Sequence, residues 1–96
     1  MIHLTATLHA KTAHIPTVRR LAQGMLMPTR QEAGCLRYDL FEQQSKQGVF
    51  LFQEQFVDQA AFEHHCQSSY FQQFIADLAD LLMDEPEIQF YSSLSE

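Results

Sequence analysis

The chain has 96 residues, of which 46% are hydrophobic and 19% are charged, and its formal net charge is −6 at pH 7. A chain of this length buries only roughly 60–65% of its unfolded surface, so we expect a single domain over residues 1–96 that gains stability from pairing with a second copy. The negative charge argues against a nucleic-acid partner, which requires a basic face. It also argues against an anionic membrane surface.

The opening residues, MIHLTATLHA, have neither the basic start nor the long apolar run of a signal peptide or membrane span. We therefore expect a cytoplasmic protein without a membrane partner. Cys35 and Cys66 are far apart in the chain and form no CxxC pattern, which indicates two reduced, buried thiols.

Hydrophobic periodicity predicts the first two elements. Residues 2–10 alternate between apolar and polar side chains, which is typical of a strand. Residues 14–32 carry apolar side chains at helical spacing. Pro16 suits the first turn of that helix, and Pro28 is expected to kink or end it.

Two further strands, 35–43 and 49–57, flank the turn sequence QSKQG and form a predicted hairpin. Asp58 is the expected N-cap of a short helix over 59–66.

A second helix is predicted from Ser69, which forms a capping-box pattern with Gln72, to about Met83. The last segment, EIQFYSSL, alternates again and is the fourth predicted strand. The order β-α-β-β-α-β predicts an α+β, ferredoxin-like fold, with a four-stranded antiparallel sheet and helices on one face. The other face of the sheet would be bare in a monomer.

Strand alternation divides the side chains between the two faces of this sheet. The face expected to contact the helices carries Ile2, Leu4, Ala6, Leu8, Leu36, Tyr38, Leu40, Phe50, Phe52 and Phe56. The opposite face, which includes Cys35 and Arg37, is mixed in polarity and suits a wet interface with a second copy.

Glu54 is the exception on the face that the helices cover. A buried carboxyl group must pair, form hydrogen bonds or raise its pKa. Glu54 is therefore either a strand-end residue that reaches solvent or a backbone amide, or a carboxylate that lines a pocket.

The segment FEHHCQSSYF places two histidines on opposite sides of the predicted helix. His65 shares a side with Phe62, whereas His64 faces away, because adjacent helical positions diverge by about 100°. This divergence argues against a zinc site and against a catalytic pair of Cys66 and His65. His65 is either a core histidine bonded to a backbone carbonyl or a pocket histidine that carries protons.

Three residues after this helix have simpler interpretations. Ser68 and Ser69 are expected as helix caps. Tyr70 lies in the first turn of the next helix, where it either fills space or offers its hydroxyl to a ligand.

Two stretches resemble a known family. PTRQEAGCLRYDLFEQ (28–43) and FLFQEQFVDQAAFEHHCQSSYFQQF (50–74) are similar to the runs PTRxEPGCLRYDLF and FVLYERWEDEAALDAHLASPHFQ of the antibiotic biosynthesis monooxygenase domain family. The resemblance implies a dimeric α/β barrel, in which two ferredoxin-like subunits pair through their sheets and each has a pocket between sheet and helices. Members include cofactor-independent monooxygenases of quinols or polyketide phenols, heme-degrading enzymes and isomerases of a phosphorylated dione.

The resemblance also implies roles by position. Glu54 matches the family's strand glutamate, His65 its recurrent histidine and Ser68 the serine that follows. Tyr70 replaces a frequent second histidine. Phe56 stands where a tryptophan is common, which makes heme degradation less expected.

The resulting functional prediction is a cofactor-independent monooxygenase that oxidises a small aromatic or quinol-type substrate with dioxygen. The predicted catalytic residues are His65, Glu54 and Tyr70, and the predicted substrate contacts are Leu4, Tyr38, Phe52, Phe56, Phe62 and Ser68. A base, His65 or Glu54, would remove a phenolic proton, and the anion would give an electron to dioxygen without a flavin or a metal ion.

Two alternatives remain from the sequence. An isomerase of a small carbonyl compound would use the same acid and base, with Arg30 or Arg37 binding an anionic substrate. A non-catalytic, ligand-binding homodimer would have the same fold, because one fold hosts many functions.

Overall fold

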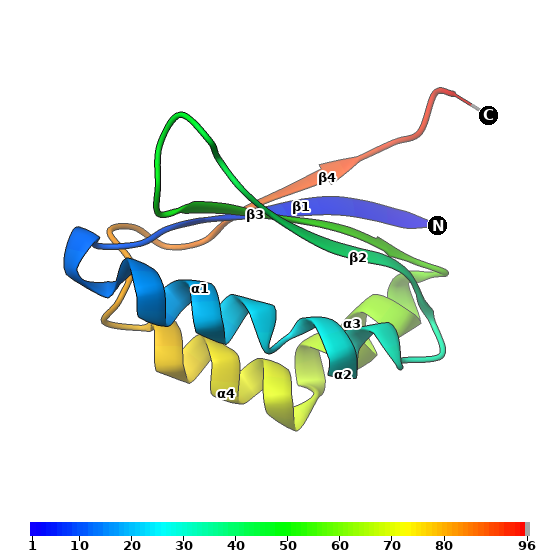
Figure 1. Ribbon diagram of the computed structural model, residues 1–96. Coiled ribbons are helices and arrows are strands. Elements are labelled where there is room, and N and C mark those ends of the chain that lie inside the picture. The colour runs from blue at the N-terminus through cyan, green and yellow to red at the C-terminus, as the bar shows by residue number, and fades with distance from the viewer. Residues whose placement is uncertain (96) are drawn as a thin grey trace.

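The computed structural model describes residues 1–95. They form a four-stranded antiparallel sheet in the order β2-β3-β1-β4, with the helices against one face (Figure 1). The strands are β1 (Ile2–His9), β2 (Cys35–Glu42), β3 (Val49–Phe56) and β4 (Glu87–Tyr91). The helices are the 3-10 turn η1 (Thr12–His14), α1 (Ile15–Gln23), α2 (Leu26–Arg30), α3 (Gln59–Gln67) and α4 (Ser69–Leu78). The predicted α+β, ferredoxin-like fold is confirmed.

The predicted helix over 14–32 is interrupted one turn before Pro28, between α1 and α2. Pro28 cannot donate a hydrogen bond to the carbonyl of Gly24, four residues earlier, and in a continuous helix its ring would clash with that carbonyl. The kink expected from Pro28 is therefore present, and it is displaced to Gly24 and Met25.

The two caps around α3 and α4 were predicted with different success. Asp58 is the N-cap of α3, as predicted, because its Oδ1 accepts from the Ala61 amide at 2.8 Å. Of the two serines expected as caps, Ser68 is the N-cap of α4, and its Oγ accepts from the Phe71 amide at 3.3 Å, whereas Ser69 is the first residue of the helix.

The helix α4 ends at Leu78 rather than near Met83. The chain beyond it turns to pair with the end of β1, where the Met83 amide donates to the His9 carbonyl at 2.7 Å. The Lys11 amide likewise donates to the Leu81 carbonyl at 2.9 Å. These bonds replace helical ones, so a tertiary contact ends the helix early.

A β-bulge at the start of β2 reverses the predicted orientation of two residues. Cys35 pairs with Phe56 and Arg37 with Gln55, which leaves Leu36 as the extra residue. Leu36 is consequently 51% exposed, and Cys35 packs against the core. Both predictions from simple alternation were wrong here.

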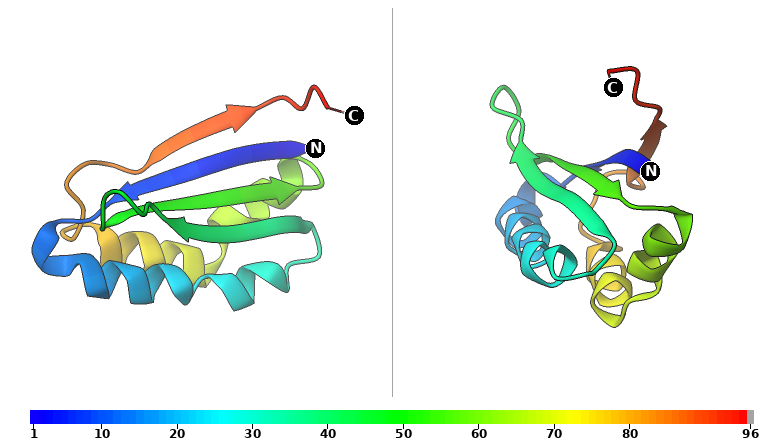
Figure 2. Two further views of the ribbon diagram at one scale, coloured as in Figure 1. Left: turned by 45° about the horizontal axis from the view of Figure 1, so that its top comes forward. Right: turned by 90° about the vertical axis from the view of Figure 1, so that its right-hand side faces the viewer.

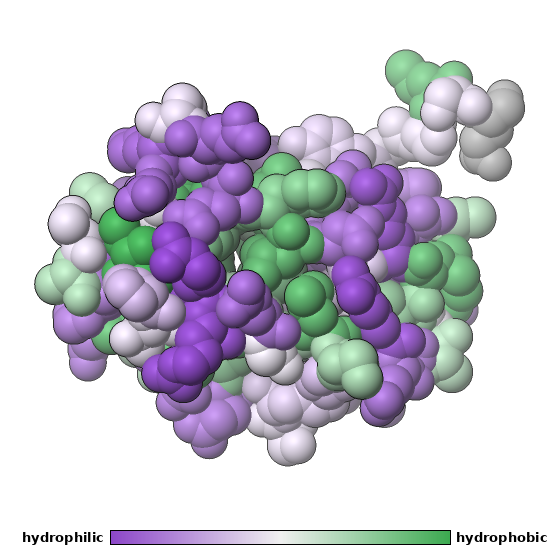
Figure 3. All heavy atoms as spheres, viewed as in Figure 1, coloured by the Kyte–Doolittle hydropathy of each residue, from purple (hydrophilic) through white to green (hydrophobic). Residues whose placement is uncertain are grey.

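The core lies between the sheet and the helices, and within residues 1–95 no helix covers the opposite face of the sheet (Figure 2). Residues buried in this core include Leu4, Ala6, Leu8, Val18, Ala22, Tyr38, Phe50, Phe52, Phe56, Phe74 and Leu78. Figure 3 shows that apolar side chains also reach the surface in places between strongly polar ones. Within the described residues, no helix has the length and apolar composition needed to cross a bilayer.

Gly34 allows the connection between α2 and β2 to lie directly against α3. A Cβ atom at this position would overlap the side chain of Ala61. The Gly34 carbonyl accepts from the Val57 amide at 2.9 Å, which fixes the connection at the end of β3. The absence of a side chain at Gly34 is therefore a packing requirement.

Replacing Gly34→Ala should lower the free energy of unfolding by about 1–3 kcal/mol, because the new methyl group overpacks the contact with Ala61. Urea denaturation followed by circular dichroism measures this loss. The matched background is Ala61→Gly, which removes the opposing methyl group. If Gly34→Ala costs as much in that background as in the wild type, the steric explanation is wrong.

Candidate functional site

A cavity of about 130 Å³ lies between the sheet and helices α3 and α4. Glu54 from β3 and His65 from α3 both line it, as alternation and helical spacing predict. The other residues that line it are aliphatic, aromatic or thiol side chains: Leu4, Ala6, Leu8, Tyr38, Phe52, Phe62, Cys66, Phe71, Phe74, Ile75, Pro86 and Ile88. An acid and an imidazole thus share one apolar cavity.

His65 is held in place by aromatic rings. Its side chain is only 1% exposed, whereas the neighbouring His64 is exposed, as predicted. The centroid of its ring lies 5.0 Å from that of Phe71, 5.2 Å from that of Phe56 and 5.5 Å from that of Tyr38. Contacts of this kind on several sides restrict the orientation of the imidazole.

Glu32 is the carboxylate that binds His65. Its Oε2 lies 3.0 Å from His65 Nδ1, and its side chain is only 7% exposed. The Tyr70 hydroxyl donates to the same oxygen. Periodicity could not reveal this residue, because Glu32 lies in the irregular connection between α2 and β2, where no pattern assigns a face. The PTRQEAG run contains Glu32, so the family resemblance is the one sequence signal that points to it.

This arrangement fixes the proton on one nitrogen of His65. A carboxylate oxygen that already accepts from the Tyr70 hydroxyl also accepts from Nδ1–H. The proton therefore resides on Nδ1, and Nε2 is left as the basic nitrogen. Among residues 1–95, Nε2 has no hydrogen-bond partner, and neither does Glu32 Oε1. Since buried polar atoms are normally paired, Nε2 is a natural contact for a ligand.

Glu54 is in a different electrostatic state from Glu32. Its side chain has no hydrogen-bond or ion-pair partner within the described residues, and the residue is only 6% exposed. Burial, reinforced by the negative charge of Glu32, raises the pKa of Glu54 to about 8. Burial likewise raises the pKa of the Tyr38 hydroxyl well above its usual value. At neutral pH, Glu54 is therefore mostly protonated and can donate a hydrogen bond into the cavity.

Three predicted site residues do not line the cavity. Phe56 lies beside the ring of His65. Ser68 caps α4, and its hydroxyl donates to the His65 carbonyl at 2.7 Å. Tyr70 bonds to Glu32 instead of facing the cavity. These side chains surround and support His65, and the predicted substrate contacts that do line the cavity are Leu4, Tyr38, Phe52 and Phe62.

The two arginines considered as anion-binding residues point elsewhere. Arg30 donates to the Tyr38 carbonyl at 2.9 Å and to Asp39 at 3.1 Å. Arg37 donates to Asp39 at 2.7 Å, and these guanidinium contacts, with Arg37 the stronger, hold the pKa of Asp39 below its usual value. Neither arginine lines the cavity.

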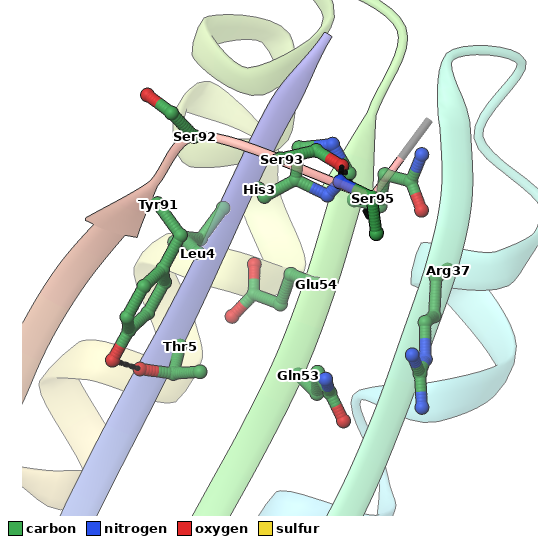
Figure 4. A pocket seen from close by; sticks show the side chains of 11 residues that line it. His3, Leu4, Thr5, Arg37, Gln53, Glu54, Tyr91, Ser92, Ser93 and Ser95 are labelled. Atoms are coloured by element: carbon green, nitrogen blue, oxygen red, sulfur yellow. Dashed lines mark hydrogen bonds between the residues drawn. The ribbon is translucent and has the colours of Figure 1, made fainter.

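A larger hollow of about 380 Å³ lies on the uncovered face of the sheet (Figure 4). Its side chains come from all four strands and from the segment after β4, and Thr5 Oγ1 donates to the Tyr91 hydroxyl at 3.4 Å. This hollow is more open and more polar than the inner cavity, so it excludes water less well. The inner cavity is therefore the better candidate for chemistry that requires desolvation.

Metal-binding and thiol chemistry have little support at this site. No group of three or more His, Cys, Asp or Glu side chains within residues 1–95 is placed to hold a metal ion. Cys35 and Cys66 are free thiols, as predicted, but they are half-buried rather than buried. Burial raises the pKa of both thiols, which makes them less reactive as nucleophiles.

Comparison with known proteins identifies the family. The family model of antibiotic biosynthesis monooxygenases matches residues 1–77. The chain belongs to this family. It is 33% identical over 82 residues to the Bacillus subtilis protein named "Putative monooxygenase YcnE", a match that spans 85% of this chain and 86% of that protein. The family supports monooxygenase chemistry at this general level.

Two further likenesses have names that state no activity. The uncharacterized Synechocystis protein sll1783 is 37% identical over 71 residues, which is 74% of this chain but only about half, 48%, of that protein. The crystal structure of PA3566 from Pseudomonas aeruginosa superposes with a TM-score of 0.93 at 32% identity, covering 98% of this chain and 94% of that one.

The ionisation of Glu54 should make the protein less stable as the pH rises. Between about pH 4.5, the ordinary value, and about pH 8, the folded state holds a proton on Glu54 that the unfolded state has lost. The free energy of unfolding should therefore fall by up to about 1.4 kcal/mol per pH unit in this window and level off above it. Glu54→Gln removes this titration.

Urea denaturation of the wild type and of Glu54→Gln at pH 5, 6, 7 and 8 isolates the contribution of Glu54 as a difference. The free energy of unfolding of Glu54→Gln, relative to that of the wild type, should increase at each step to higher pH. Parallel stability curves for the two proteins would contradict the assigned pKa.

Proposed function

We propose that this protein is a cofactor-independent monooxygenase that oxidises a small phenolic or hydroquinone substrate with dioxygen in the cavity beside His65. One observation carries the proposal: a buried imidazole on an aromatic-lined cavity, bonded through Nδ1 to Glu32 and without a partner at Nε2. This is the arrangement of a general base. The family to which the chain belongs supports the oxidative direction.

In the first step, His65 Nε2 takes the proton of a substrate hydroxyl. Glu32 stabilises the imidazolium that forms and keeps the ring oriented, as carboxylates paired with histidine do in other enzymes. Tyr70 acts on Glu32 by donating to its Oε2. The three side chains come from the α2–β2 connection, α3 and α4.

Glu54 is assigned the role of hydrogen-bond donor rather than base. Because its pKa is about 8, it carries a proton at neutral pH and can stabilise a substrate oxygen that becomes negative. His65 is therefore the base, and the two residues divide the roles of acid and base.

The oxidation itself needs only the substrate anion and dioxygen. The phenolate gives one electron to dioxygen, and the resulting radical pair combines to form a carbon–oxygen bond on the ring. The hydroperoxide that forms then loses water. For a hydroquinone, the balance is hydroquinone plus dioxygen giving a hydroxyquinone plus water, with one oxygen atom retained. The apolar lining limits water access and holds the reactants together.

We also propose that the protein works as a homodimer that pairs through the uncovered face of the sheet. This face carries large, exposed apolar side chains among polar ones, with Phe41 48% exposed and Tyr91 56% exposed. A surface of this mixed character is typical of an interface between subunits. Pairing would also add burial to a small domain.

Purified protein should raise oxygen uptake above the buffer rate when mixed with methylhydroquinone, as measured with an oxygen electrode. His65→Ala should lower this rate by about 10²–10⁴-fold, because general-base catalysis is lost. His64→Ala is the matched control, because it changes an adjacent, exposed histidine and should leave the rate unchanged. Product formation without oxygen would point instead to the isomerase.

A second variant tests the assignment of Glu32 as a positioning residue. In the wild type, ¹⁵N NMR should show His65 as the Nδ1–H tautomer. Glu32→Gln should yield a mixture of tautomers together with slower oxygen uptake, whereas a purely structural role would leave the tautomer unchanged in the folded variant.

If the protein is a dimer, its sedimentation coefficient in analytical ultracentrifugation should be the one expected for two subunits. Phe41→Asp places a charge on the uncovered face and should shift the protein toward monomers. The control is Met27→Asp, because Met27 lies on α2 and is 69% exposed. If the wild type sediments as a monomer at tens of micromolar protein, pairing through this face is wrong.

A further inference from the structure

We propose that the substrate is an uncharged, one-ring phenol or hydroquinone with an aliphatic substituent. This substituent extends out of the cavity between α4 and β4. This inference deepens the proposed function and rests on it. The ring would lie inside with its hydroxyl at Glu54 and His65, and the substituent would lie across the apolar mouth.

Burial distinguishes the inner end of the cavity from its mouth. Glu54 is 6% exposed and His65 is 1% exposed, so the polar groups lie at the inner end. Ile75 on α4 is 41% exposed and Ile88 on β4 is 45% exposed, although both line the same cavity. Pro86 lines the cavity near Ile88 in the chain. Ile75 and Ile88 therefore form the exposed edge of this cavity, and we place the entry of the ligand between them.

The position of β4 explains why the mouth is apolar. In the described part of the chain β4 is an edge strand that pairs with β1, and Ile88 lies opposite Ala6 in that pairing. Ala6 faces the helices, so Ile88 does as well. Phe90, two residues further on, contacts Phe62 of α3 edge to face, with ring centroids 5.6 Å apart. The helix-facing side of β4 is therefore apolar but remains exposed.

The volume of the cavity limits the size of the enclosed part. An engineered protein cavity of about 150 Å³ binds one benzene molecule, and this cavity measures about 130 Å³. It therefore accepts a single ring. A flexible chain can continue through the mouth, whereas a fused second ring would add rigid volume that a cavity of this size does not hold.

The charge of the residues that line the cavity limits the charge of the ligand. Among the described residues, those that line the cavity include Glu54 but no arginine or lysine. A carboxylate or phosphate on the substrate would be buried beside this acid without a cation to balance it, which is costly. The ligand is therefore neutral when it binds.

The test measures binding of phenols by isothermal titration calorimetry without oxygen, so that no turnover occurs. 4-Propylphenol should bind at least about tenfold more tightly than phenol, because its substituent contacts the mouth. It should also bind more tightly than 1-naphthol, which has a similar apolar surface in a rigid second ring. 4-Hydroxybenzoate should bind at least about tenfold more weakly than phenol. Equal affinities across this series would overturn the inference.

Two variants locate the substituent. Ile88→Ala and Ile75→Ala should each weaken the binding of 4-propylphenol by about 3- to 10-fold, while the affinity for phenol changes less than twofold. Met27→Ala, which removes an exposed apolar side chain on α2, is the matched control and should change neither. If the mouth variants weaken both ligands equally, or neither ligand, the proposed path of the substituent is wrong.

The outcomes for ligand and chemistry are separable. Preference for 4-propylphenol without oxygen uptake on any hydroquinone would support the ligand class and contradict the monooxygenase. Oxygen uptake that depends on His65, with no preference for the alkyl substituent, would support the monooxygenase and contradict the ligand class.

Discussion

The contact between Glu32 and His65 is the interaction on which the site depends. One buried carboxylate oxygen receives His65 from α3 and Tyr70 from α4, and so joins two helices to the connection that leads into β2. Two residues later, the missing side chain of Gly34 lets the same connection lie against α3. The close packing of this connection against α3 therefore helps to keep Glu32 near His65. This matters because a buried charge is tolerated only where its partner is held within hydrogen-bonding distance.

The two acids of the core have different states because their surroundings differ. Glu32 has a histidine and a phenol as partners, whereas Glu54 faces an apolar cavity and the negative charge of Glu32. Two carboxyl groups in one poorly solvated region do not both ionise easily, so the unpaired one keeps its proton. A single environment thereby holds one protonated acid and one carboxylate paired with a histidine, and many enzymes obtain opposite proton-transfer roles at neutral pH from such differences.

Regular elements made much of this arrangement predictable from sequence. Alternation placed Glu54 on the helix-covered face, and helical spacing turned His65 inward and His64 outward. The failures occur where a pattern breaks. The bulge at Leu36 adds a residue to the strand, which the alternation of apolar and polar side chains does not predict. The end of α4 depends on hydrogen bonds to the end of β1, which the local sequence does not indicate. Glu32 lies between elements, so its partner could be known only from the fold.

The early end of α4 has a consequence for how relatives of this protein could diverge. Residues 79–86 leave the helix, are tied to the end of β1 and then lead to Pro86 and Ile88 at the mouth of the cavity. Glu32, Glu54 and His65 belong to other segments. Insertions or deletions in this connector would reshape that edge of the cavity while leaving Glu32, Glu54 and His65 in place, so the shape of the cavity and its polar groups can evolve as separate traits on one scaffold.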